Sequence, residues 1–289
     1  MTTYGQLITD AMRELEKLEY SDAALEAKEL LGKALGVDCR SARFEQLLWE
    51  EAEDAAEQEF FSLVQRRMKN EPLQYILGEW DFYGITLSVG PGVLIPRQDT
   101  ELLVDIAIKL RREAEETELI DLCAGSGCIG FAIEQRLKNV SATLVENYTD
   151  PMSYMLTNKL SLGSRASLVK GDVLDEKLPP QLPKADLIVC NPPYLTARDM
   201  DELQAEVRAE PVEALYGGED GLDFYRAVVR LWKDNVKLGG CLAFEVGIGQ
   251  AEEVAELMIQ HGFKNVRRAK DAGGIERVVY GERYEKPVY

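Results

Sequence analysis

Residues 119–133 read LIDLCAGSGCIGFAI, an apolar run that leads into a glycine-rich loop and then into a second apolar run. Gly125, Gly127 and Gly130 match the pattern GxGxxG, which alone is weak evidence for a dinucleotide site. In a dinucleotide loop the first glycine usually lies directly at the strand end, whereas three residues separate Asp121 from Gly125 here. The stretch therefore predicts a strand, a ligand-binding loop and a helix, and its spacing disfavours a dinucleotide.

Strand-like and helical runs alternate after Pro96. Helices are expected at 98–113, 128–137, 151–161, 221–235 and 250–261, and strands at 118–122, 141–146, 166–170, 186–190, 240–246, 264–269 and 276–281. Alternation of this kind predicts an α/β domain with a mainly parallel sheet, covered on both faces, whose ligands bind beyond the carboxyl ends of the strands. The Gly-Gly and Gly-Phe pairs at 239–240 and 262–263 suggest that the last strands are antiparallel.

The N-terminal part of the chain has a different pattern of apolar residues. Residues 1–70 carry apolar positions at helical spacing in YGQLITDAMRELEKL, SDAALEAKELLGKAL and EDAAEQEFFSLVQRRM, which predicts a helical-bundle domain. Ser21 with Asp22 would cap the second helix, and Gly36 would end it. Residues 71–92 are rich in aromatic and β-branched residues broken by glycines, which predicts a β-hairpin connector to a second domain at 93–289.

The composition narrows the class of protein. The 289 residues carry a net charge of −18, and this field repels a nucleic-acid backbone unless a local basic patch opposes it. Five scattered cysteines form no CxxC pair or Cys/His cluster, so we expect reduced thiols and no metal site. Neither a signal peptide nor a membrane span is readable, and a cytoplasmic location is the default expectation.

Acidic residues close the next two predicted strands. Glu146 ends ATLVE, where its two carboxylate oxygens could accept from two ribose hydroxyls; a solvated strand-end charge is the alternative. Asp172 follows Gly171, where it could accept from an adenine amino group while Val173 adds apolar cover; a turn residue is the alternative. Together with Asp121, which could hold an ammonium group directly or through water, these strand ends predict a site for S-adenosylmethionine (SAM).

A fourth strand end carries the stretch DLIVCNPPY, residues 186–194. The Asn191 side-chain carbonyl and the Pro192 backbone carbonyl, held by restricted φ angles, are two fixed acceptors that match one planar NH2 group. Tyr194 would lie against the flat face of that group. The alternative is that Asn-Pro-Pro forms only a turn.

Over nearly its whole length the chain resembles the HemK/PrmC family of peptide chain release factor glutamine methyltransferases. The segments that carry the resemblance are EPLQYILGEWDFYG, VLIPRQDTELLVD, DLCAGSGCIG, NPPY, EVRAEPVEALYGGEDGLDFYR and GGCLAFEVGIGQAEEV. The resemblance implies a Rossmann-like SAM-dependent methyltransferase domain that methylates the glutamine of the Gly-Gly-Gln loop of class I release factors. The partner would be the release factor, with no direct nucleic acid, membrane or metal, and the protein would be a monomer.

The resemblance also assigns residues position by position. The implied cofactor residues are Asp121, Cys123, Ala124, Gly125, Ser126, Gly127, Glu146, Asp172, Val173 and Asn191. The implied residues for the target amide are Asn191, Pro192, Pro193 and Tyr194, with Asn191, Pro192 and Tyr194 as the catalytic set. The chain departs from the family pattern at Cys123, where glycine is common, at Glu146, where aspartate is common, and at Gln98, where proline is common.

An amide nitrogen is a poor nucleophile, so we expect Asn191 and Pro192 to act by orienting it, with the proton leaving to solvent. The sole histidine, His261, lies far from every motif and is expected to be structural. Arg97 and the segment 217–222 could touch the ligand or only brace the loops, and we favour bracing. The domain at 1–70 is expected to recognise the release factor, so that its deletion would weaken use of the intact factor and leave SAM binding.

Three other functions are compatible with parts of the pattern. An N6-adenine methyltransferase of nucleic acid shares the Asn-Pro-Pro-Tyr corner, but the acidic charge and the family segments disfavour it. The loop spacing disfavours an NAD enzyme. A non-catalytic SAM-binding scaffold would be indicated by inert residues at 146 or 191, and both positions are polar.

Overall fold

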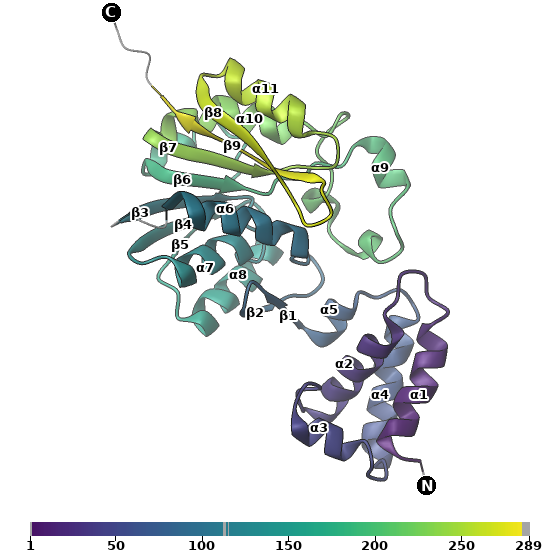
Figure 1. The fold of residues 1–289 in the computed structure, drawn as a ribbon. Coiled ribbons are helices and arrows are strands. Elements are labelled where there is room, and N and C mark those ends of the chain that lie inside the picture. Colours follow the sequence, from purple (N-terminus) through teal and green to yellow (C-terminus); the bar gives the residue numbers. More distant parts are fainter. Residues whose placement is uncertain (1, 112–113, 115, 285–289) are drawn as a thin grey trace, which may run out of the picture. The chain divides into compact units, whose positions relative to one another are not determined.

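The computed structural model describes residues 2–111, 114 and 116–284. It divides into two compact units (Figure 1). The helical unit consists of Met1–Glu79 together with Gln204–Ala209, a segment that the chain contributes from much later in the sequence. The sheet unit consists of Trp80–Leu203 and Glu210–Tyr289.

Short apolar helices form the helical unit. They are α1 (Tyr4–Leu15), α2 (Ala23–Leu35), α3 (Ala42–Leu47), α4 (Asp54–Arg67) and α5 (Leu73–Leu77). The three helices predicted from periodicity are confirmed as α1, α2 and α4, and α2 packs against both others. Asp22 caps α2 by accepting from the Leu25 N–H, and Gly36 ends it with a φ of 62°. The other two helices have six and five residues, too few to produce a periodic pattern.

A two-stranded sheet follows the helices. Its strands are β1 (Glu79–Phe82) and β2 (Ile85–Ser88). The two residues that join them, Tyr83 and Gly84, have φ angles of 49° and 77°. Positive φ at both central residues is the mark of the tight turn that matches the twist of a two-strand hairpin.

A seven-stranded sheet forms the centre of the sheet unit. Its strands are β3 (Thr117–Leu122), β4 (Val140–Glu146), β5 (Ser167–Lys170), β6 (Ala185–Cys190), β7 (Val236–Glu245), β8 (Phe263–Lys270) and β9 (Glu276–Arg283). The order is β5-β4-β3-β6-β7-β9-β8. Strands β3 to β7 pair in parallel, and β9 pairs antiparallel with both β7 and β8, as the sequence predicted.

The start of β7 differs from the prediction. The strand was expected to begin at Gly240, but β7 begins at Val236 and contains both Gly239 and Gly240. Gly239 has a φ of 75°, and the pairing of β6 with β7 shifts register between Ala185 and Leu187. The glycines therefore produce an irregularity inside the strand, a common role of glycine in sheets.

Helices cover both faces of this sheet. They are α6 (Glu101–Arg111), α7 (Cys128–Arg136), α8 (Thr149–Leu162), α10 (Asp223–Trp232) and α11 (Ala251–Gln260), whereas the short helix α9 (Ala197–Asp201) lies in the segment after β6 and buries none of its residues. Leu119 packs in one core with α6, α7 and α8, while its neighbour Ile120 packs in a second core with α10 and α11 (Figure 1). Successive strand residues thus point to opposite faces, and both are buried.

The connecting segments contain short 3-10 turns. They are η1 (Gln98–Thr100), η2 (Pro179–Gln181), η3 (Val207–Ala209), η4 (Val212–Ala214) and η5 (Lys233–Asn235). The helix predicted over 98–113 is η1 followed by α6, and residues 112 and 113 lie outside the described residues. In the part of the chain that the structure describes, no helix has both the length and the apolar character needed to cross a bilayer.

The strand order fixes where a ligand can bind. The chain runs from β3 outward to β4 and β5, then returns to β6 on the other side of β3 and continues to β7. The carboxyl ends of β3 and β6 are therefore neighbours at the point where the winding reverses. Crevices of open α/β sheets form at this point.

Candidate functional site

A pocket of about 300 Å³ opens at the carboxyl ends of β3, β4, β5 and β6, within the sheet unit. Of the residues predicted from the sequence, those that line it are Cys123, Ala124, Gly125, Ser126, Glu146, Asp172, Val173, Asn191 and Pro193. Four others, Asp121, Gly127, Pro192 and Tyr194, are not among its lining residues. The structure thus brings the four strand ends together around one cavity.

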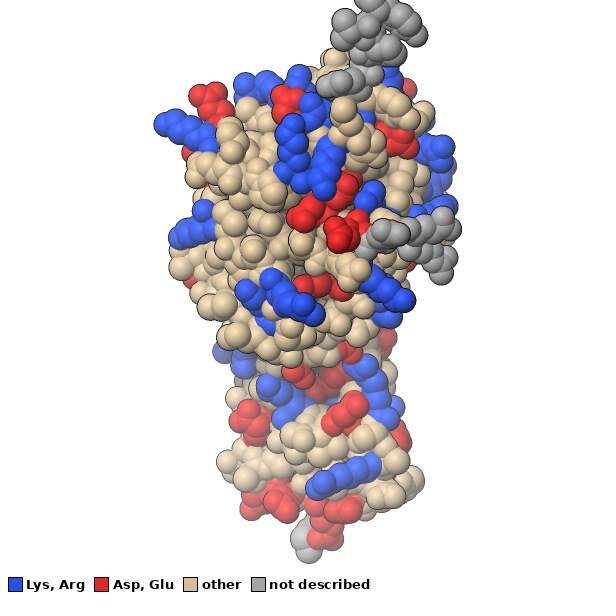
Figure 2. Space-filling model, turned by 90° about the vertical axis from the view of Figure 1, so that its left-hand side faces the viewer, with Lys and Arg blue, Asp and Glu red and all other residues tan. Residues whose placement is uncertain are grey.

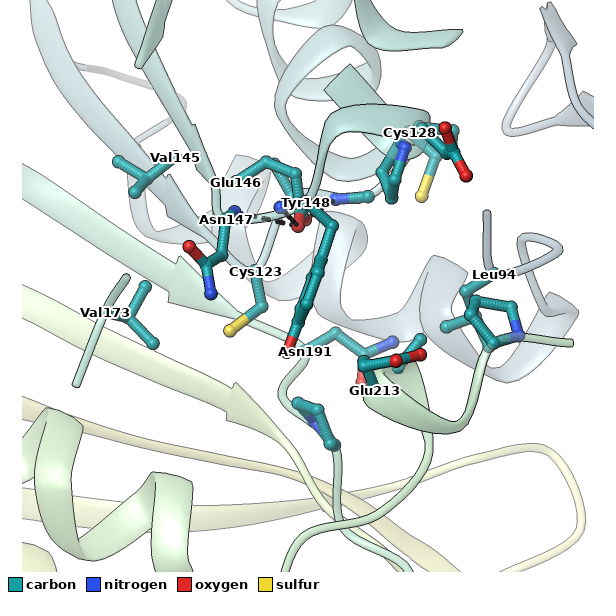
Figure 3. Close-up of a pocket in the computed structure, with 18 of the residues that line it drawn as sticks. Leu94, Cys123, Cys128, Val145, Glu146, Asn147, Tyr148, Val173, Asn191 and Glu213 are labelled. Carbon is teal, nitrogen blue, oxygen red and sulfur yellow. Dashed lines mark hydrogen bonds between the residues drawn. The ribbon is translucent and has the colours of Figure 1, made fainter. Parts of the chain in front are cut away.

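Glu146 is tied to the glycine loop by hydrogen bonds. Its Oε2 accepts from the Gly125 N–H at 2.9 Å, and its Oε1 accepts from the N–H groups of Asn147 and Tyr148 at 2.8 and 2.9 Å (Figure 3). A carboxylate oxygen has lone pairs for more than one donor. Glu146 therefore holds the loop in place and still presents acceptors to the pocket that it lines.

Asp121 is fully buried beneath the loop. Its Oδ2 accepts from the Gly130 N–H at 2.9 Å, while its Oδ1 has no partner among the described residues. Burial raises the pKa of Asp121 to about 7, and the nearby Glu146 adds to the rise while the Gly130 N–H opposes it. A buried carboxylate oxygen without a donor fits a ligand that supplies a positive group or an ordered water.

Two glycines of the loop have structural reasons to be glycine. Gly127 begins α7 with a φ of 83°, and a Cβ there would lie 2.3 Å from the Phe131 ring. A Cβ on Gly130 would lie 2.8 Å from Leu144 and 3.0 Å from the Asp121 carboxylate. The loop therefore packs closely on the helix and on the neighbouring strand, and Gly127 serves the backbone without lining the pocket.

Cys123 lies on the pocket wall in an unusual conformation. Its φ is 58°, in the left-handed region that favours glycine. Its thiol lies beside that of Cys190, and after burial this contact is the next largest cause that raises the pKa of the Cys190 thiol. All five cysteines are free.

The loop after β5 forms a turn and lines the pocket. The Asp172 Oδ1 accepts from the Leu174 N–H at 2.8 Å, which is a turn-forming contact, and Asp172 also lines the pocket. Val173 is buried, and its carbonyl accepts from the Trp232 indole at 2.9 Å. The loop is thus anchored to α10 while its acid lines the cavity.

The Asn-Pro-Pro-Tyr corner is held from several sides. The Asn191 Nδ2 donates to the Thr100 hydroxyl at 3.4 Å, and the Tyr194 carbonyl accepts from the Gln250 amide at 2.9 Å. A Cβ on Gly217 would lie 2.6 Å from the Pro193 carbonyl oxygen, and one on Gly221 would lie 2.3 Å from the Tyr194 carbonyl oxygen. This close packing supports a bracing role for segment 217–222.

Arg97 does two things. It ion-pairs with the buried Glu210, which also accepts from the Ile95 N–H at 3.0 Å, so it braces the chain before α6. It also lines the pocket. His261 is not among the pocket residues. It caps the end of α11, and its Nδ1 lies 2.8 Å from the Leu257 carbonyl oxygen.

Comparisons with known proteins give the family. Residues 6–78 match the family described as "PrmC N-terminal domain", and residues 98–217 match that described as "Methyltransferase small domain". A "Release factor glutamine methyltransferase" of Geobacter sulfurreducens is 42% identical over 263 residues, which cover 90% of this chain and 89% of that protein. One of Thermodesulfovibrio yellowstonii is 36% identical over 279 residues, with 93% and 96% covered.

The chain belongs to the release factor glutamine methyltransferase family. Solved structures of lower identity agree on the fold of the sheet unit. A methyltransferase of Pyrococcus furiosus has a TM-score of 0.54 and 16% identity and covers 71% of this chain and 91% of that one. A T. thermophilus 16S rRNA methyltransferase in complex with AdoMet and guanosine has a TM-score of 0.52 and 18% identity, with 71% and 49% covered. These structures confirm the Rossmann-like methyltransferase fold, and membership of the family confirms SAM as the cofactor.

Several pocket residues of this family member were missed from the sequence. Tyr148 and Asn147 line the pocket directly after Glu146, and Glu213 lines it from the segment after the Asn-Pro-Pro-Tyr corner (Figure 3). The position of Tyr148 two residues beyond a strand-end acid was a usable signal. No spacing rule links Glu213 or Thr100 to the strand ends, because they come from irregular segments.

Proposed function

We propose that this protein transfers the methyl group of SAM to the side-chain amide nitrogen of the glutamine in the Gly-Gly-Gln motif of class I release factors. One structural observation carries the proposal: Asn191, the first residue of the acceptor corner, lies on the wall of the same pocket as Glu146 and Asp172. The names of relatives that are up to 42% identical over most of the chain support the choice of glutamine and release factor.

For methyl transfer to an amide, the Asn-Pro-Pro-Tyr corner must orient one NH2 group. Because the Asn191 Nδ2 is engaged with Thr100, the Asn191 Oδ1 is the end of the amide left to accept. Within the described part of the chain, no backbone N–H donates to the Pro192 carbonyl. Asn191 lines the pocket and Pro192 follows it directly, so we propose that their two carbonyls accept the two N–H hydrogens of the glutamine amide.

This arrangement favours transfer by orientation and by charge. The SAM sulfonium supplies the methyl group: a nitrogen–carbon bond forms, the carbon–sulfur bond breaks with its electrons going to sulfur, and one N–H proton passes to water. Two acceptors at the nitrogen stabilise the positive charge that grows on it. Holding two reactants in line can supply roughly 7–11 kcal/mol, so no strong base is needed.

The residues around the cofactor take proposed roles by their chemistry. Glu146 would accept from the ribose hydroxyls, and Asp172 with Val173 would contact adenine. The partnerless Asp121 Oδ1 would receive the ammonium group, directly or through a water molecule. Cys123 to Gly127 would form the loop around the amino-acid end of the cofactor.

The helical unit is proposed to recognise the body of the release factor. Trp49 and Tyr20 of this unit are 87% and 72% exposed, and exposed aromatic side chains are frequent anchors of protein interfaces. Trp49→Ala should lower kcat/KM for the intact factor by about tenfold and leave that for a short Gly-Gly-Gln peptide unchanged. Ile259→Ala, which removes an exposed side chain of α11, is the control. If Trp49→Ala has the same kcat/KM for the intact factor as the wild type, this role of Trp49 is contradicted.

The activity itself is tested with methyl-labelled SAM and a class I release factor. Label should appear on the factor and disappear when the glutamine of its Gly-Gly-Gln motif is replaced by alanine. Label that survives this replacement, or that appears on RNA, would reject the proposal. Binding of SAM without any transfer would indicate a scaffold.

Nucleic acid as the substrate has little electrostatic support. Lys and Arg are interspersed with Asp and Glu on the face drawn in Figure 2, and the net charge is −18. A phosphate backbone binds a contiguous basic surface better than a mixed one. We further propose that the protein acts as a monomer; sedimentation at assay concentrations tests this.

A further inference from the structure

Glu245 lies behind the acceptor corner, at the carboxyl end of β7. Its neighbour Phe244 pairs with Cys190 across the parallel strands β6 and β7, so Glu245 and Asn191 are adjacent strand-end residues. Glu245 is 2% exposed, and its Oε2 has no partner among the described residues. A buried acid with one unused oxygen calls for an explanation, because burial of a charge is costly.

The carboxylate accepts from two side chains of the corner. The Thr100 hydroxyl and the Asn191 amide both donate to Glu245, and the Asn191 Nδ2 also donates to the Thr100 oxygen at 3.4 Å. The three groups form a small hydrogen-bonded network. The Asn191 amide donates to the Thr100 hydroxyl and to the carboxylate, and the Thr100 hydroxyl donates to the carboxylate, so the carboxylate is the final acceptor. An ionised carboxylate can only accept, so it fixes this direction.

The direction matters because an asparagine amide has two ends of nearly the same shape. Turned one way, Asn191 offers an oxygen to the pocket, and turned the other way it offers a second NH2 group. Only the oxygen can accept an N–H of an incoming amide. The group that contacts the far end of Asn191 therefore determines whether the corner can bind its target.

We propose that Glu245 is a positioning residue for the transfer, whose carboxylate holds the Asn191 amide with its oxygen toward the acceptor nitrogen. This inference rests on the proposed function of the same site. Glu245 touches neither reactant: it acts only through Asn191 and Thr100.

The ionisation of Glu245 adds a measurable consequence. Burial raises the pKa of Glu245 to about 7, while Thr100, Arg277 and Asn191 lower it and Asp99 raises it. The ionisable groups that face it also include Cys128, Tyr194 and Tyr225. A protonated Glu245 can donate to the Asn191 oxygen, and that contact turns the amide the wrong way.

The test uses Glu245→Gln in the full chain, with intact release factor and saturating SAM. The glutamine keeps the shape but brings a donor to the network, so kcat should fall by about 100-fold while the Kd for SAM stays the same. Asp186→Asn is the matched control, since Asp186 lies at the other end of β6 and accepts from the Glu118 N–H and from Lys237. Its kcat should be unchanged.

The pH profile separates positioning from a merely structural role. Wild-type kcat should fall as pH drops below about 7, and this limb should be absent in Glu245→Gln. Glu245→Asp keeps a carboxylate and should recover part of kcat together with the limb, which provides a second variant if Glu245→Gln folds poorly. A wild-type kcat that is flat between pH 5.5 and 8, or full activity of Glu245→Gln, would overturn the inference. Absence of transfer by the wild type would instead reject the proposed function.

Discussion

The backbone N–H of Gly125 donates to the Glu146 Oε2 at 2.9 Å, so the loop after β3 and the acid after β4 form a single hydrogen-bonded unit. A side chain that holds the loop cannot be altered without moving the loop. Glu146→Gln should therefore weaken SAM binding by about 10- to 100-fold. The substitution replaces one carboxylate oxygen by an NH2 group, which cannot accept from the backbone N–H groups.

Titration calorimetry with SAM measures this change. Glu134→Gln is the control, since Glu134 also accepts from a backbone N–H, that of Arg165 at 3.1 Å, but lies outside the pocket. Equal affinities of Glu146→Gln and Glu134→Gln for SAM would contradict the linkage between acid and loop.

Asp121 should make stability depend on pH. Its pKa is raised by burial from 3.8 to about 7, so the folded state keeps a proton that the unfolded state has already lost between these values. The free energy of unfolding should therefore fall as pH rises from about 4 to 7, with a slope of up to about 1.4 kcal/mol per pH unit from this group. Asp121→Asn should lack this contribution.

Urea unfolding of the wild type and of Asp121→Asn at several pH values measures the contribution of Asp121 to the free energy of unfolding. Glu245 contributes equally to both proteins and cancels in the difference. SAM affinity should change in the opposite sense, rising with pH up to about 7 because the ionised acid is the form that attracts an ammonium group. Parallel pH profiles of unfolding would rule out a protonated Asp121 in the folded state.

Cys123 should be strained by its backbone conformation. A residue with a Cβ costs roughly 1–2 kcal/mol in the left-handed region, where Cys123 lies with a φ of 58°. Cys123→Gly should thus be more stable than Cys123→Ala by about 1 kcal/mol, since both lack the thiol and only the glycine relieves the strain. Thermal unfolding compares the two, and a more stable alanine variant would refute the strain.

Arg67 and Arg66 are neighbours in α4 with different expected effects. Arg67 is 1% exposed and ion-pairs with Glu26 at 2.8 Å and with Glu206, all within the helical unit. Arg67→Met should cost about 3–5 kcal/mol, because it leaves a buried glutamate without its cation. Arg66→Met breaks only a partly exposed pair with Glu71 and should cost at most about 1 kcal/mol.

Calorimetric unfolding of the full chain reads both variants. A similar stability loss in the two would contradict the buried-pair account, as would a loss confined to the transition of the sheet unit.

The fold was predictable where a pattern is long. The alternating runs after Pro96 gave the strands and most helices, because a buried parallel strand and a ten-residue helix each leave a clear signal. Helices α3, α5 and α9 have six, five and five residues and left none. The start of β7 was predicted four residues late, at Gly240 in place of Val236, because a glycine within a strand resembles one in a turn.

The site was predictable at strand ends, where an acid or amide follows an apolar run. Glu146, Asp172 and Asn191 were found in this way, and the structure places all three on one pocket. Glu245 also follows an apolar run but was overlooked, since its role depends on contacts with Thr100 and Asn191 that sequence spacing does not encode. Glu213 was missed because an irregular segment brings it to the pocket.

The adjacency of β3 and β6 has a geometric consequence. The glycine loop after β3 and the Asn-Pro-Pro-Tyr corner after β6 begin on strands one ladder spacing apart, a separation of about 4.8 Å that peptide hydrogen bonding sets. No exchange of side chains alters that spacing. Variation at Pro211, Glu213 and Ala214, which line the pocket from a separate segment, can therefore reshape the cavity while these two strand ends keep their spacing.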